Sequence, residues 1–114
     1  MKRLTPQELQ LQSEDPQTPQ VVDVRSAEEF AAGHVPGALH IPLDELPGRL
    51  SELPRDRPVV TYCNMFHPGS SRGERAAEHL SELGFDAAVL EGGFPAWQER
   101  GAATQQEVGS PEQD

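Results

Sequence analysis

The single cysteine of the chain, Cys63, stands between two patterns that could make it reactive. The residues before it, Val59–Tyr62, are typical of a buried strand. The residues after Ser71 predict a helix, because Ser71 and Glu74 have the spacing of a capping box. A helix N-terminus presents backbone N–H groups and the positive end of a dipole, which stabilise a thiolate and attract an anion. This spacing indicates a nucleophilic sulfur beside a site for a persulfide sulfur, a sulfite-like oxyanion, a phosphate or an arsenate.

The alternative interpretation is a cysteine that only packs, because cysteine is among the most buried residue types. The composition of the following loop and an arginine in the first helical turn favour the reactive interpretation. We expect the main-chain N–H groups of this loop to hold the anion, and the arginine to order the loop or the donor. The candidate site comprises Cys63 with Asn64, Met65, Phe66, His67, Gly69, Ser70, Ser71 and Arg72.

The elements that must position this site alternate between strands and helices. Strands are predicted over 21–24, 38–41, 59–62 and 87–90, and helical segments over 26–33, 44–50, 71–83 and 94–100, with a short helix starting at Thr5. This alternation predicts an α/β fold with a mainly parallel sheet and helices on both faces. Sites in such sheets lie at the carboxyl ends of the strands, where Cys63 and Asp23 are expected.

Length and charge restrict the remaining possibilities. The 114 residues fit one domain, predicted over 1–101, and an acidic, disordered tail over 102–114. The net charge is −10, of which the tail supplies −3, so neither nucleic acid nor an anionic membrane is an expected partner. There is no long apolar run and no apolar segment after the start that would indicate a secretory signal. One cysteine cannot form an internal disulfide, so a reducing cytoplasm is the expected location.

The ordered motifs of the chain resemble the rhodanese family. The first signature is formed by Asp23-Val24-Arg25, Glu29-Phe30 and the segment 33–42, GHVPGALHIP. The segment 60–63, VTYC, is similar to the strand that carries the catalytic cysteine, and 90–97, LEGGFPAW, to the closing motif. The resemblance implies a parallel sheet of about five strands and a sulfurtransferase in which Cys63 carries sulfur as a persulfide. It also implies a small donor such as thiosulfate or a persulfide, a thiophilic acceptor such as a protein thiol, and neither metal nor organic cofactor.

The loop after Cys63 departs from the usual family pattern C-x-x-G-x-R. Here eight residues separate Cys63 from Arg72, which is an insertion of four. The related phosphatases and arsenate reductases resemble C-x5-R, which is also shorter. Two other functions therefore stay open: a phosphatase or arsenate-reductase-like enzyme that uses the same thiolate, and a non-catalytic module that binds a partner through the long loop.

Several other residues have both a structural and a functional interpretation. We expect Asp23, Arg25 and Glu29 to tie loops together by buried hydrogen bonds rather than to bind substrate. His34 and His40 flank a strand but lack metal-ligand spacing, so no metal site is predicted. The remaining candidate, Trp97, is expected to pack the last helix.

Overall fold

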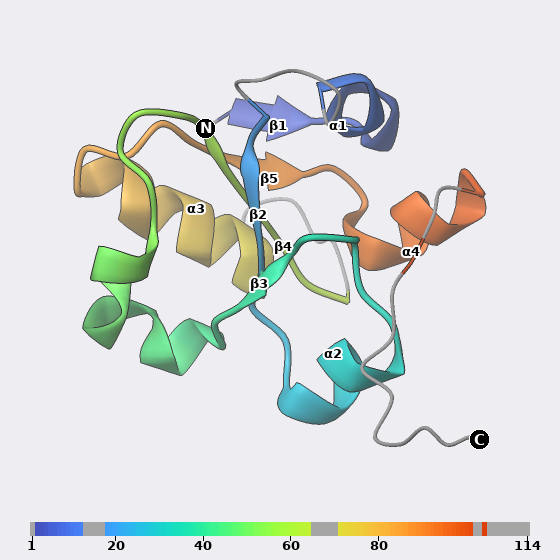
Figure 1. Cartoon of the computed structure of the whole chain (residues 1–114), viewed down its shortest axis with the longest axis horizontal. Helices are drawn as coiled ribbons and strands as arrows, with labels where there is room; N and C mark the ends of the chain where they lie inside the picture. The colour runs from blue at the N-terminus through green and yellow to red at the C-terminus, as the bar shows by residue number, and fades with distance from the viewer. Residues whose placement is uncertain (1, 13–17, 65–70, 102–103, 105–114) are drawn as a thin grey trace.

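The computed structural model describes residues 2–12, 18–64, 71–101 and 104 (Figure 1). Its centre is a five-stranded parallel sheet with the strand order β1-β5-β4-β2-β3. The strands are β1 Lys2–Leu4, β2 Gln20–Asp23, β3 Leu39–His40, β4 Val59–Tyr62 and β5 Ala87–Leu90. The helices are α1 Pro6–Gln12, α2 Ala27–Ala32, α3 Arg72–Glu82 and α4 Gly93–Glu99, with 3₁₀ helices η1 Leu43–Gly48 and η2 Leu50–Glu52. The α/β class, the parallel sheet and its five strands are those predicted.

Two apolar layers cover the two faces of the sheet, because neighbouring residues of a strand point to opposite faces. Val59 packs in the cluster that contains α3 and η1, whereas Val60 and Tyr62 pack in the cluster that contains Leu9 of α1 and Trp97 of α4. Figure 1 shows α3 on one face of the sheet and α4 on the other. The helical periodicity of α3 buries Ala76, Ala77 and Leu80 against the strands.

Local sequence signals account for the limits of the helices near the site. Ser26 caps α2 and Ser71 caps α3, each in a capping box with the glutamate three residues later. Gly84 follows α3 with a φ of 93°, which a glycine adopts without steric cost. Both helices thus begin where the sequence predicted.

Three features differ from the sequence prediction. The edge strand β1 was not predicted; it pairs with β5 although its Lys2 and Arg3 are exposed. The segment expected to be helical over 44–50 forms two 3₁₀ helices, of which η1 contains Pro47. Leu83, the last residue of the helix predicted over 71–83, lies after the end of α3 as its C-cap and is 40% exposed. The predicted tail, 102–114, lies outside the described residues apart from Thr104.

Candidate active site at the carboxyl edge of the sheet

Cys63 follows β4 directly and packs in the cluster on the α3 face of the sheet, where it is 3% exposed. Its main chain is fixed by α4, since the Phe94 N–H donates to the Cys63 carbonyl at 2.9 Å. On the other side, the start of α3 approaches the strand closely. A Cβ at Gly73 would lie 3.2 Å from the Cys63 nitrogen, and the Thr61 hydroxyl donates to the Gly73 carbonyl at 2.6 Å. The cysteine therefore lies beside the N-terminal turn of α3.

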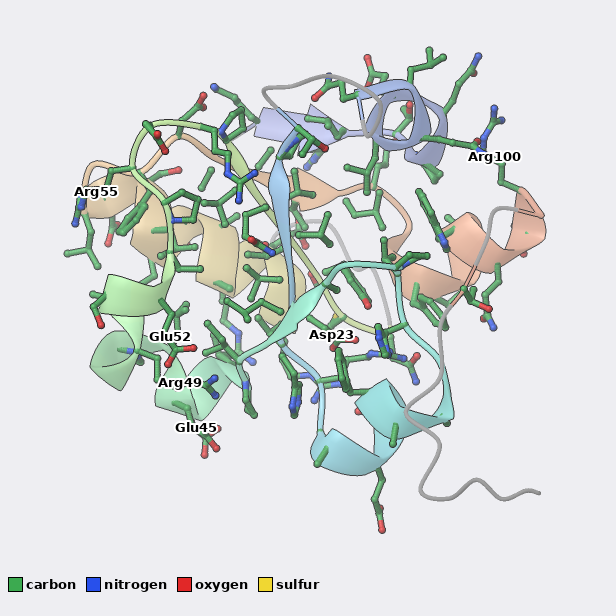
Figure 2. All side chains as sticks on the ribbon, viewed as in Figure 1. Asp23, Glu45, Arg49, Glu52, Arg55 and Arg100 are labelled. Atoms are coloured by element: carbon green, nitrogen blue, oxygen red, sulfur yellow. The ribbon has the colours of Figure 1, made fainter. Side chains whose placement is uncertain are left out.

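The buried pair of Asp23 and Arg25 lies at the same edge of the sheet. Figure 2 labels Asp23, the last residue of the neighbouring strand β2. The side chains are 0% and 3% exposed, so removing either charge would leave the other one buried and uncompensated. Arg25 Nε lies 3.0 and 3.1 Å from the two Asp23 oxygens, and Nη2 donates to Oδ2 at 2.7 Å. Arg25 Nη2 also donates to the Gly33 carbonyl at 2.6 Å, which holds the end of α2.

The hydroxyl of Tyr62, the residue before the cysteine, completes this buried cluster. It donates to Asp23 Oδ2 at 2.7 Å and accepts from the Val35 N–H at 3.1 Å. The sequence motifs assign no role to this side chain. The contact depends on the strand register, which pairs Asp23 with Tyr62 across adjacent strands and which the sequence motifs do not specify. The cluster fixes the end of β4 immediately before Cys63.

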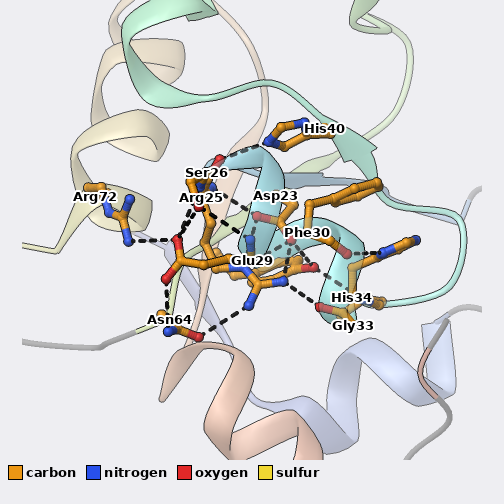
Figure 3. A network of polar contacts seen from close by, with 12 residues as sticks. Asp23, Arg25, Ser26, Glu29, Phe30, Gly33, His34, His40, Asn64 and Arg72 are labelled. Carbon is orange, nitrogen blue, oxygen red and sulfur yellow. Dashed lines mark hydrogen bonds and ion pairs between the residues drawn. The ribbon is translucent and has the colours of Figure 1, made fainter. Parts of the chain in front are cut away.

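A second carboxylate, Glu29 of α2, joins the two ends of the active-site loop (Figure 3). Asn64 Nδ2 donates to Glu29 Oε2 at 3.0 Å, and Arg72 Nη2 lies 3.6 Å from Glu29 Oε1. Arg25 Nη1 donates to Asn64 Oδ1 at 3.1 Å, so both polar groups of the Asn64 side chain are used. Asn64 and Arg72 thus share one anchor, although eight residues separate Arg72 from Cys63.

The environment shifts three pKa values in this cluster. Burial works against the charge of Arg25, but its hydrogen bonds and attraction to Asp23 outweigh burial and raise its pKa. Partial burial also works against the charge of Glu29, yet hydrogen bonds from Ser26 and then the charge of Arg72 hold its pKa below the usual value. Burial and the Asp23 charge raise the pKa of Tyr62 well above its usual range. All three shifts favour the protonation states that form the observed contacts.

The histidines at this end of the sheet hold loops together. His34 Nδ1 and His40 Nε2 each lie 2.8 Å from a backbone carbonyl, of Phe30 and Arg25 respectively, so these ring nitrogens donate. Both rings also stack on the Phe30 ring. Within the part of the chain that the structure describes, no group of three or more His, Cys, Asp or Glu could hold a metal ion.

A cavity of about 460 Å³ opens beside Arg72. Most of its wall is apolar, and it is lined by Val24, Arg25, Ser26, Pro42, Leu43, Asp44 and Arg72. A larger cavity, of about 580 Å³, includes Leu9 and Trp97 in its wall and belongs to the opposite face of the sheet. We associate the smaller cavity with the candidate site because, of these two cavities, it is the one lined by Arg25 and Arg72.

The predicted site residues fall into three groups. Cys63, Asn64, Arg72, Asp23 and Arg25 all lie at this edge of the sheet. Ser71 also lies there, but its N–H and its hydroxyl both donate to Glu74 Oε1, so they serve the cap of α3. The other predicted contacts lie outside the described residues, namely Met65, Phe66, His67, Gly69 and Ser70.

Comparison with known proteins identifies the family of the chain. The family model described as rhodanese-like domain matches residues 5–100. A protein of Allochromatium vinosum named sulfurtransferase is 38% identical over 82 residues, which cover 71% of this chain and 73% of that protein. A rhodanese-like domain protein from Staphylococcus aureus has a TM-score of 0.81 at 31% identity and covers 95% of this chain and 100% of its own. A rhodanese-related protein from Thermoplasma volcanium has a TM-score of 0.79 at 28% identity, covering 92% and 98%.

The chain therefore belongs to the rhodanese-like domain family. The resemblance inferred from three sequence motifs is confirmed, and so is the fold that it implied. In the described part of the chain, no helix has the length and apolar character needed to cross a membrane.

Proposed function

We propose that the protein is a sulfurtransferase that carries sulfane sulfur on Cys63 as a persulfide. The observation that carries this proposal is the position of Cys63, between the carboxyl end of β4 and the N-terminal turn of α3, in a chain of the rhodanese-like family. The relative named sulfurtransferase supports the same activity. A thiol that must stay free between cycles also fits the cytoplasm.

The reaction needs only the thiolate, a sulfur donor and an acceptor. The Cys63 thiolate attacks the outer sulfur of the donor, a new S–S bond forms, and the S–S bond of the donor breaks. Thiosulfate would leave as sulfite, and a persulfide RSS⁻ would leave as the thiolate RS⁻. An acceptor, such as a small thiol or a protein thiol, then attacks the outer sulfur of the Cys63 persulfide and restores the thiolate.

The neighbouring residues have distinct proposed roles in this cycle. The positive end of the α3 dipole and the N–H groups of the loop before it stabilise the anionic sulfur. Arg72 interacts with an anionic donor. Asp23, Arg25 and Tyr62 keep the end of β4 and the side chain of Asn64 in position, because their hydrogen bonds converge there.

The test compares the wild type with Cys63→Ser on three substrates: thiosulfate with cyanide as acceptor, a low-molecular-weight persulfide with a thiol acceptor, and an aryl phosphate ester. The proposal predicts transfer from at least one sulfur donor in the wild type and none in the variant. Hydrolysis of the phosphate ester that depends on Cys63, without sulfur transfer, would favour the phosphatase-like alternative. Inactivity on all three substrates would favour a binding module.

A further inference from the structure

Both arginines at the carboxyl edge of the sheet are already matched by carboxylates. Arg25 pairs with Asp23, and the guanidinium of Arg72 lies 3.6 Å from Glu29. Glu29 is fixed in this place by its capping box, in which its Oε1 accepts from the Ser26 N–H and hydroxyl at 3.1 Å. The carboxylate is thus held beside the site independently of Arg72.

This pairing reduces the positive field with which the site attracts an anion. A carboxylate within about 4 Å of a guanidinium cancels most of its field at longer distances. Glu29 also accepts a hydrogen bond from Asn64, so its negative charge lies beside the residue that follows Cys63. A dianion that approaches Cys63 therefore meets Arg72 and Glu29 together, and their net charge is close to zero.

We propose that Glu29 is a specificity-determining positioning residue that makes the Cys63 site selective for donors of low charge. This inference rests on the proposed sulfur transfer and specifies its substrate class: persulfides of organic thiols are preferred over the thiosulfate dianion. Glu29 acts through Arg72 and Asn64, which it holds at the two ends of the loop.

The cavity beside Arg72 supports the same substrate class. Its wall includes the apolar side chains Val24, Pro42 and Leu43, and its volume of about 460 Å³ is far larger than thiosulfate needs. An organic thiol bearing the sulfane sulfur would place its carbon atoms against these side chains and gain from their burial. Thiosulfate has no such atoms.

Alkylation of Cys63 tests the charge selection without requiring sulfur transfer. Iodoacetate and iodoacetamide form the same S–C bond with the thiolate and expel iodide, but only iodoacetate is charged. The ratio of their rate constants cancels the thiolate fraction and the accessibility of the sulfur. The ratio is measured for the wild type, for Glu29→Gln and for Glu28→Gln. Glu28→Gln is the matched control, because Glu28 is an exposed acid in the same turn of α2.

Removing the Glu29 charge should raise the iodoacetate to iodoacetamide ratio about three- to tenfold above that of Glu28→Gln, as expected for one charge several ångströms away at intermediate dielectric. The difference should shrink at 1 M salt. Equal ratios in the two variants would overturn the inference. Glutamine preserves the capping box. If Glu29→Gln nevertheless fails to fold, Glu29→Ala and Glu28→Ala provide the same comparison, with the same outcomes.

The donor preference is measured on the same proteins. The kcat/KM for thiosulfate relative to that for an organic persulfide should rise about three- to tenfold in Glu29→Gln and stay near the wild-type value in Glu28→Gln. An unchanged relative value in Glu29→Gln would contradict the inference, while leaving sulfur transfer intact. Absence of transfer from either donor in the wild type would instead contradict the proposed function, and the alkylation ratio would still decide the role of Glu29.

Discussion

Replacing Asp23 by asparagine tests the buried cluster that holds the end of β4. The variant keeps the shape of the side chain but removes the charge that balances Arg25, and its amide NH₂ replaces an oxygen that now accepts from Arg25 and from Tyr62. Arg25 would stay buried, at 3% exposure, and its guanidinium N–H groups would face the amide N–H groups of the asparagine. Breaking a buried ion pair in this way costs about 3–5 kcal/mol, because one charge is left uncompensated.

Urea unfolding, followed by the fluorescence of the buried side chain of Trp97, measures this cost. With an ordinary urea dependence for a domain of this size, the midpoint should fall by about 2 M. The control is Asp86→Asn, which removes an exposed carboxylate that pairs with Lys2 and should cost less than about 1 kcal/mol. A loss below about 1 kcal/mol for Asp23→Asn, or a loss equal to that of the control, would refute this account of the cluster.

Three further predictions concern residues in or next to this buried cluster. Gly73→Ala should lower stability by about 1–3 kcal/mol in urea unfolding and slow alkylation of Cys63, because the new Cβ would press on the main chain of β4. Tyr62→Phe should cost about 1–3 kcal/mol, since the Val35 N–H loses its acceptor; a cost near zero would contradict this. The lowered pKa of Glu29 means that its stabilising effect is present above pH 4.5 and is lost as the pH falls through its folded-state pKa. The stability difference between the wild type and Glu29→Gln should therefore be larger at pH 7 than at pH 3, and a difference independent of pH would refute the assignment.

The sequence was most informative where one short segment determines its own structure. The limits of β4 and β5 matched the predicted ones, and the capping boxes placed the starts of α2 and α3. These signals are local, because a cap or an apolar run depends on residues a few positions apart. The alternation of strands and helices then placed Cys63 at the carboxyl edge of the sheet.

Features that depend on the strand order could not be predicted in the same way. β1 has only three residues and little apolar pattern, and it forms through pairing with β5 near the other end of the chain. The capping role of Glu29 was visible in the spacing, but its bond to Asn64 joins residues 35 positions apart. That contact exists because β2 and β4 are neighbours in the sheet, which the motifs alone do not specify.

The proposed transfer of sulfur through Cys63 can be observed by intact mass spectrometry, after the protein is incubated with a sulfur donor and the donor is removed. Persulfide formation predicts a mass increase of one sulfur atom, about 32 Da, located on the peptide that contains Cys63 and reversed by a thiol acceptor. Cys63→Ser should show no increase, because the chain has no other cysteine. An unmodified Cys63 after treatment of the folded protein with both thiosulfate and an organic persulfide would contradict a persulfide mechanism at Cys63.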